Sequence, residues 1–114
     1  MKVQLRRIAH VRSGDKGDTS TVSVFAYSDE VYPILKDQVT AAAVKAFYGS
    51  AVTGEVTRYE VDGLCGLNFA IRGSLGGGVS RSLAIDNYGK AFSAALLGLI
   101  IEIPDTMANH VLGQ

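Results

Sequence analysis

Residues 11–27 read VRSGDKGDTSTVSVFAY, and this stretch carries most of what the sequence says about architecture. The run from Thr19 to Tyr27 is rich in β-branched and aromatic residues, which favour strands. Upstream, the apolar residues from Val3 to Val11 are spaced as in a strand with an irregularity near Arg6-Arg7. The glycine-rich segment Arg12 to Thr19 is therefore predicted to be a turn that joins two strands.

Downstream, helical and strand patterns interleave. Thr40 is predicted to cap a helix that ends at Gly49, and Asp62-Gly63 marks a turn between strands. The spacing predicts helices over 29–39 (with Pro33 in the first turn), 41–48 and 90–97, and strands over 52–61, 67–72, 81–86 and 100–103. This order lacks regular βα alternation, so the predicted class is α+β, a two-layer sandwich of a mostly antiparallel sheet with helices packed on one face.

Length and charge limit the organisation and the partners. A chain of 114 residues with 47% apolar and 19% charged residues is expected to form a single domain over 1–114, with 105–114 as a frayed tail. The formal net charge is zero, with 11 basic and 11 acidic side chains, which argues against nucleic acid as a partner. The same balance gives little repulsion between copies, so we expect a homo-oligomer.

Cysteine and histidine usage points to a cytoplasmic protein without a metal site. Cys65 is the single cysteine, so neither an internal disulfide nor a cysteine-based metal site can form within one chain. His10 and His110 are isolated and do not suggest a metal site either. The apolar run from Ala91 to Ile101 is shorter than the roughly 20 residues that cross a membrane, so no membrane partner is expected. No cofactor is indicated.

Two glycine-rich segments, Arg12 to Thr19 and Leu75 to Ser82, combine bare backbone with cations and hydroxyls. Glycine lets a ligand approach the backbone amides, and lysine and arginine supply charge-assisted donors, which together suit an anion. If the segments converge at one end of the sheet, they form a pocket. Otherwise they only shape turns, with a solvated Lys16. The candidate ligand-binding residues are Arg12, Ser13, Gly14, Asp15, Lys16, Gly17, Asn68, Gly76, Gly77, Gly78 and Arg81.

Catalytic residues are not assigned. Asp15 and Asp18 are candidates for acid–base work or a divalent cation, but an ion pair with Lys16 is the simpler interpretation. Cys65 is either a nucleophile or a small, partly buried thiol. His10 is either a proton shuttle or a packing residue.

The remaining signals lie in predicted strands. The amide of Asn68 either contacts a ligand or bridges backbone groups. Its neighbour Phe69 is predicted to be a core residue.

Four signatures, in this order and at these separations, resemble the small C-terminal domain of acyclic terpene utilisation (AtuA-like) proteins. They are Arg12 to Gly17, Asn68-Phe69, Leu75 to Gly78, and Asp86 to Lys90, and the resemblance runs from about Leu5 to Pro104. It implies a ferredoxin-like fold and a role beside a much larger domain in the degradation of branched terpenoid acids as coenzyme A thioesters. We therefore expect a free-standing small subunit or a separately encoded version of this domain, with a large AtuA-like subunit as its partner.

Three functions remain open. The first is a ligand-binding subunit that holds the anionic end of an acyl-coenzyme A for a larger catalytic partner. The second is a structural module that oligomerises through a strand edge or an apolar face. The third is a small self-sufficient enzyme, acting on a thioester or a hydroxy acid, that uses Asp15, Lys16 or Cys65.

Overall fold

The computed structural model describes residues 1–16, 19–73 and 91–111. Its strands are β1 (Lys2–Gln4), β2 (Ala9–Lys16), β3 (Thr19–Ala26), β4 (Val56–Val61), β5 (Gly66–Arg72) and β6 (Ile100–Glu102), and two of its helices are α1 (Tyr32–Gln38) and α2 (Ala41–Tyr48). Residues 91–95 are also helical. Short 3-10 turns are η1 (Leu5–Arg7), η2 (Gly49–Ala51), η3 (Asp62–Leu64), η4 (Leu96–Gly98) and η5 (Asp105–His110).

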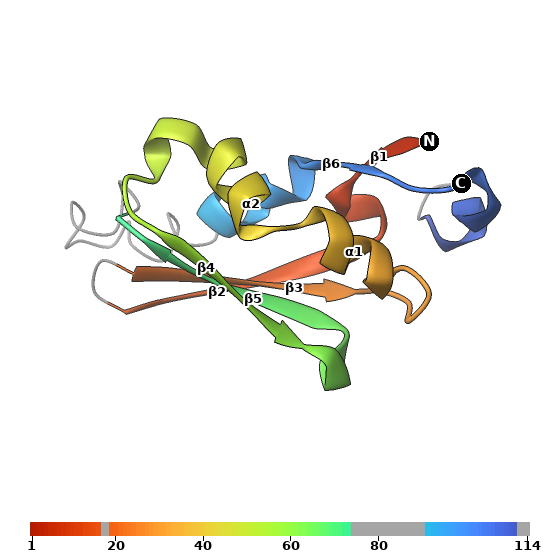
Figure 1. Cartoon of the computed structure of the whole chain (residues 1–114), viewed down its shortest axis with the longest axis horizontal. Coiled ribbons are helices and arrows are strands. Elements are labelled where there is room, and N and C mark those ends of the chain that lie inside the picture. The colour runs from red at the N-terminus through yellow and green to blue at the C-terminus, as the bar shows by residue number, and fades with distance from the viewer. Residues whose placement is uncertain (17–18, 74–90, 112–114) are drawn as a thin grey trace.

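The strands form two antiparallel sheets. A four-stranded sheet has the order β2-β3-β5-β4, and β1 pairs with β6 in a two-stranded sheet. Figure 1 shows α1, α2 and the β1–β6 pair together on one side of the larger sheet. The chain is thus an α+β sandwich with an antiparallel sheet and helices on one face, as predicted.

The core lies between the larger sheet and the helices. Strands of a one-sided sheet bury every second residue, and β5 follows this rule with Leu67, Phe69 and Ile71 at 0–1% exposure. Leu35 of α1 and Val44 of α2 are fully buried against them in the same hydrophobic cluster.

Local signals placed α2 correctly. The Thr40 side chain accepts a hydrogen bond of 3.0 Å from the Ala43 backbone amide, which satisfies one of the free donors of a helix N-terminus. Gly49 at the C-terminal end has a φ of +58°, a conformation that glycine adopts without strain. Both ends of this helix confirm the prediction.

Strand β4 begins at Val56, four residues later than predicted. The 3-10 turn Gly49–Ala51 precedes it, and the backbone of Gly54 crosses that of Arg72 so closely that a Cβ on Gly54 would lie 2.7 Å from the Arg72 carbonyl oxygen. Thr53 and Gly54 donate backbone hydrogen bonds to Gly73 and Arg72 here, so an irregular pairing precedes the regular strand. The strand predicted over 81–86 lies outside the described residues.

The segment predicted to fray is folded onto the core as far as residue 111. Asp105–His110 form 3-10 turns, and Val111 is only 5% exposed within the main hydrophobic cluster. The expectation of a frayed tail failed here because the burial of Val111, far from its packing partners in the sequence, offsets the loss of chain entropy.

Candidate functional site

The four-stranded sheet has one face under the helices and another that none of the described helices covers. Successive side chains of a strand point to opposite faces, so the register assigns each residue to a side. Arg12, Ser23, Asn68 and Tyr59 are paired in one row across β2, β3, β5 and β4. Their side chains lie on the face of the sheet opposite to the one where the Phe69 side chain is buried. We call the side of this row the open face and the other side the covered face.

The first glycine-rich segment is strand as far as Lys16. Strand β2 pairs with β3 from Ala9↔Ala26 to Lys16↔Thr19, so the prediction of a turn that starts at Arg12 was wrong. Polar residues and glycine are tolerated there because β2 is an edge strand of the sheet. Gly14 also makes room for a neighbour, since a Cβ there would lie 2.7 Å from Thr21 Oγ1 and the threonine side chain would have to shift. The connection itself is confined to residues 17 and 18, which are not described.

The predicted ligand-binding residues of β2 are divided between the two faces. Arg12 and Gly14 belong to the open face and are exposed. Ser13 alternates with them and belongs by register to the side of the covered face, although it is exposed at the sheet edge. By the backbone register, Lys16 belongs to the same face of the sheet as Arg12, and Asp15 belongs to the same face as Ser13.

Asn68 lies in the middle of the open face. Its Oδ1 accepts a hydrogen bond of 3.4 Å from the Ser23 hydroxyl on the neighbouring strand, and the residue is half-buried. This hydrogen bond links the side chains of β3 and β5 across the sheet. Phe69, its neighbour, is fully buried, which confirms its prediction as a core residue.

Both glycine-rich segments depart from the same end of the sheet. Thr19 pairs with Lys16 on one side and with Arg72 on the other. Residues 17–18 follow Lys16 directly, and the second segment follows Gly73. The remaining predicted residues, Asp18, Gly17, Gly76, Gly77, Gly78 and Arg81, lie outside the described residues.

The start of the second segment is fixed by a close backbone crossing that the sequence did not reveal. Gly73 has a φ of +69°, and a Cβ there would lie 2.6 Å from Thr53 Oγ1 and 2.8 Å from the Gly54 nitrogen. The Thr53 amide and hydroxyl both donate to the Gly73 carbonyl, each over 3.0 Å. The chain therefore enters the segment in a defined direction.

Cys65 has the features of a structural thiol. It occupies a left-handed conformation with φ of +50° between η3 and β5, and its Sγ donates to Asp29 Oδ1 over 3.1 Å. This hydrogen bond, together with partial burial, raises the pKa of the thiol. A nucleophilic cysteine needs a lowered pKa, so the geometry opposes a catalytic role for Cys65.

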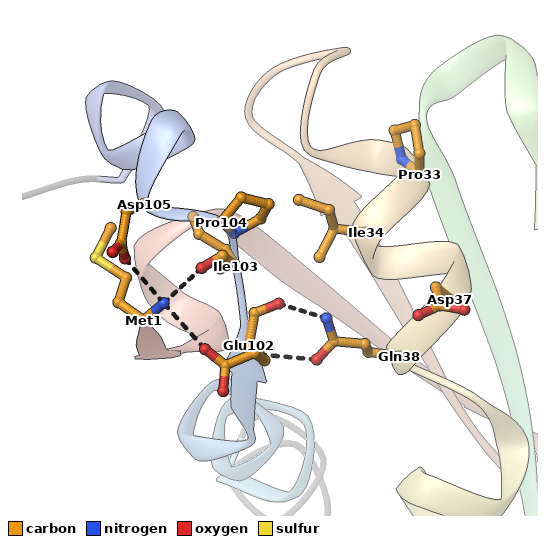
Figure 2. A pocket seen from close by; sticks show the side chains of 9 residues that line it. All are labelled: Met1, Pro33, Ile34, Asp37, Gln38, Glu102, Ile103, Pro104 and Asp105. Atoms are coloured by element: carbon orange, nitrogen blue, oxygen red, sulfur yellow. Dashed lines mark hydrogen bonds and ion pairs between the residues drawn. The ribbon is translucent and has the colours of Figure 1, made fainter.

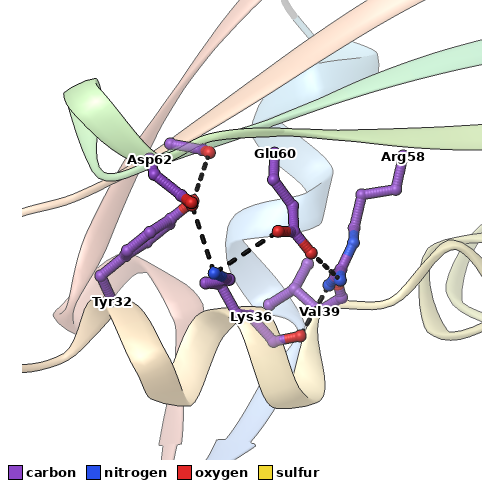
Figure 3. A network of polar contacts seen from close by, with 7 residues as sticks. Tyr32, Lys36, Val39, Arg58, Glu60 and Asp62 are labelled. Atoms are coloured by element: carbon purple, nitrogen blue, oxygen red, sulfur yellow. Dashed lines mark hydrogen bonds and ion pairs between the residues drawn. The ribbon is translucent and has the colours of Figure 1, made fainter.

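A polar network that sequence reasoning missed joins α1 to the end of β4. The Tyr32 hydroxyl lies 2.8 Å from Asp62 Oδ1 and 2.9 Å from the Gly66 carbonyl oxygen, and its hydrogen serves both acceptors. Burial, reinforced by the Asp62 carboxylate, raises the pKa of Tyr32 to about 12. Lys36 Nζ lies 3.2 Å from Asp62 and 3.4 Å from Glu60 (Figure 3).

The same contacts perturb the charged partners in opposite directions. Hydrogen bonds from Tyr32 and then Lys36 lower the pKa of Asp62, and the hydrogen bond to Asp62 is the main reason why the pKa of Lys36 is raised. A cavity of about 570 Å³ borders this network. Because its charged groups pair with one another, the network serves to hold the helix on the sheet.

Arg58 closes the C-terminal end of α1. Its Nη1 donates to the carbonyl oxygens of Lys36 over 2.6 Å and Val39 over 3.1 Å, while Nη2 pairs with Glu60 over 2.9 Å. Cations near a helix C-terminus satisfy free carbonyls and complement the helix dipole. Figure 3 shows the guanidinium reaching from β4 to this end of the helix.

A second cavity, of about 560 Å³, lies on the other side of α1 beside β6. Figure 2 shows the Gln38 amide bracketing the Glu102 backbone: it donates to the carbonyl of Glu102 and accepts from its N–H over 2.8 Å. The Met1 amine lies 2.9 Å from Glu102 and 3.2 Å from Asp105 and donates to the Ile103 carbonyl. Hydrogen bonds to Glu102 and then Asp105 raise the pKa of this amine.

His10 belongs to an aromatic cluster on the open face. Its ring centroid lies 5.4 Å from those of both Phe25 and Tyr27, and its Nδ1 is buried without a hydrogen-bond partner in the described structure. His10, Arg12, Phe25 and Leu64 border a hollow of about 360 Å³. These contacts favour the packing role for His10 over the proton shuttle.

Comparison with known proteins agrees with this architecture. A scan against protein families matched the AtuA ferredoxin-like domain over residues 3–102. The chain therefore belongs to the AtuA ferredoxin-like domain family. Neither a search of curated proteins nor a search of solved structures gave a match.

The helices seen in the described ranges fall short of the length and apolarity that a bilayer span requires.

Proposed function

We propose that this domain binds an anionic ligand at the end of the sheet where Lys16, Thr19 and Arg72 are paired, as the accessory part of an AtuA-type system. The observation that carries the proposal is the register: Lys16↔Thr19 and Thr19↔Arg72 bring the origins of both glycine-rich segments to neighbouring strands. Segments that begin side by side are suitably placed to contribute to one ligand site.

The chemistry of the two segments suits phosphate or carboxylate. Backbone amides freed by glycine bind anions in concave turns, and Lys16 and Arg81 add charge-assisted donors. The family resemblance implies acyl-coenzyme A as the source of the anion, with its phosphates at this end of the sheet. A larger AtuA-type subunit would carry out the chemistry, and the small domain would hold the ligand for it.

Arg12 and Asn68 are left out of this anion site. Each lies four residues from the sheet end, Arg12 from Lys16 and Asn68 from Arg72, which corresponds to about 13 Å along a strand. One phosphate group cannot contact both places. The proposed site therefore comprises Gly14 to Gly17, Gly76 to Gly78 and Arg81.

The test is titration of the purified chain with coenzyme A by isothermal calorimetry. We expect Lys16→Ala and Arg81→Ala each to weaken binding by about tenfold, since each removes a hydrogen bond to a charged group. Lys45→Ala and Arg6→Ala are matched controls, because both residues are exposed and lie outside the proposed site. Equal affinities for all four variants, or no binding by the unaltered chain, would refute the anion site.

A further inference from the structure

We propose that the open face binds a second copy of this chain, so that two four-stranded sheets stack face to face about a twofold axis parallel to their strands. The proposal concerns the residues that the anion site leaves unused, and it does not depend on any ligand.

Three of the five exposed large hydrophobic side chains in the described ranges, those of Tyr27, Tyr59 and Leu64, lie on this side of the molecule. The large hydrophobic residues with high exposure in the described ranges are Tyr27 (50%), Phe47 (38%), Tyr59 (55%), Leu64 (65%) and Ile100 (54%). Tyr59 is in the central row of the open face, and Tyr27 contacts His10 there. Leu64, at the end of η3, borders a hollow together with His10, Arg12 and Phe25. Aromatic and arginine side chains on an otherwise polar surface are typical of protein interfaces.

The two ends of the open face differ in character. At the end near η3 lie Phe25, Tyr27 and Leu64, where Phe25 and Leu64 border the same hollow. At the other end the register places Thr19 and Arg72. A second copy is therefore expected to bring apolar end to apolar end, because burying apolar side chains against the polar end would add the cost of removing those polar groups from water.

This requirement selects the orientation of the symmetry axis. Two sheets that face each other can be related by a twofold axis in the interface that runs either parallel or perpendicular to the strands. A perpendicular axis would place Leu64 of one copy over the threonine-rich end of the other. A parallel axis places like ends together and lays β2 over β4 of the second copy and β3 over its β5.

The central row is self-complementary about the parallel axis. Arg12 of one copy lies over Tyr59 of the other, a cation over an aromatic ring, which is a favourable contact. Ser23 lies over Asn68, and these two side chains already form a hydrogen bond within each chain. A twofold axis repeats each contact, so the Arg12 and Tyr59 pair occurs twice at the two edges of the interface.

The next row towards the polar end also fits. It reads Gly14, Thr21, Ala70 and Thr57 across the sheet. The parallel axis places Gly14 over Thr57 and Thr21 over Ala70. Each threonine thus meets a smaller residue, which allows the faces to approach to the spacing of about 10 Å found between packed sheets.

The area of contact between the two copies sets the expected affinity of the dimer. Four strands about 4.8 Å apart, with seven paired residues rising about 3.3 Å each, give a patch of about 20 Å on each side. Two copies would together bury about 800 Å² of such a patch, which is less than stable interfaces bury and is typical of weak, transient ones, so we expect a weak dimer whose population rises with concentration through the high micromolar range.

Sedimentation velocity of the full chain over a concentration series tests the surface. We expect a monomer–dimer equilibrium that Tyr59→Glu and Leu64→Glu each weaken by about tenfold or more. Both side chains are exposed, so the fold should tolerate the change, and circular dichroism checks this. Ile100→Glu and Phe47→Glu are matched controls, since they add the same charge at exposed apolar positions away from the open face. A chain that stays monomeric throughout, or a dimer that only the control variants disrupt, would overturn the proposal.

Cross-linking tests the axis. In a Cys65→Ser background, the pair Arg12→Cys and Tyr59→Cys lies at opposite edges of one sheet, three strand spacings or about 14 Å apart, too far for an internal disulfide. With a short bis-maleimide we expect covalent dimers from this double variant and few from Arg12→Cys alone. Efficient dimer formation by Arg12→Cys alone would favour β2 over β2 and contradict the parallel axis.

Discussion

Strand β5 supplies neighbouring residues to two surfaces that differ in almost every physical respect. Phe69 on the covered face has no exposed area, while Asn68 on the open face is half-buried and contacts Ser23. Strand β3 repeats the contrast with buried Val22 and half-buried Ser23. Alternation therefore lets one strand contribute to stability through one set of side chains and, in our proposal, to recognition through the other, so that the two roles can be altered separately.

The largest difference in stability should appear between substitutions at two adjacent residues that lie on opposite faces of the sheet. Phe69→Ala removes a fully buried ring and should lower the free energy of unfolding by about 3–5 kcal/mol, whereas Asn68→Ala should change it by less than about 1 kcal/mol. Urea denaturation followed by circular dichroism measures both. Similar losses for the two variants would show that the faces are not energetically distinct.

A smaller difference is expected for Arg58 and Tyr59, which are adjacent on β4. Arg58→Met keeps the apolar stem but leaves the Lys36 and Val39 carbonyls without their donor, which should reduce the free energy of unfolding by about 2 kcal/mol. Tyr59→Phe loses an exposed hydroxyl and should change it by less than about 0.5 kcal/mol. The urea midpoints of the two variants, compared at a concentration where the chain is monomeric, check this order. If Tyr59→Phe is the more damaging change, the assignment of Arg58 to helix anchoring fails.

The smallest effect is expected in the pH dependence of stability, and it arises from groups on the covered side of the sheet. The pKa of Asp62 is lower in the folded chain, so its ion pair stabilises the fold above the ordinary carboxyl pKa and is lost as pH falls through the lowered value. Asp62→Asn should therefore flatten the decline in stability below about pH 4, and urea midpoints from pH 2 to pH 7 would reveal it. Asn68→Asp, an added carboxyl on the open face, is the control and should not flatten the curve. An unchanged slope in Asp62→Asn would contradict the network.

Local features were readable from the sequence, and long-range ones were not. The Thr40 cap, the end of α2 at Gly49 and the break between β1 and β2 each depend on a few adjacent residues. The open face depends on β3 pairing with β5, so that Ser23 meets Asn68, and spacing alone does not identify strand neighbours. Contacts such as Cys65 with Asp29 are equally hidden, because their partners lie 36 residues apart.

In the candidate site, too, local features were readable from the sequence and long-range ones were not. Composition identified two glycine-rich segments, and the register placed their origins at one end of the sheet. However, the sequence suggested a turn where β2 continues to Lys16, because a polar, glycine-containing edge strand has the same composition as a turn. Sequence reasoning also grouped Arg12 and Asn68 with the glycine-rich segments, since distance along a strand is not apparent until its partners are known.

Hydroxyl-radical footprinting of the full chain at low and high concentration tests most directly whether the open face is the surface used for recognition. We expect Tyr59 and Leu64 to become protected as the concentration rises, while Phe47 and Ile100 stay as reactive as before. Protection of Phe47 and Ile100 with unchanged reactivity at Tyr59 and Leu64 would contradict the division between the two faces.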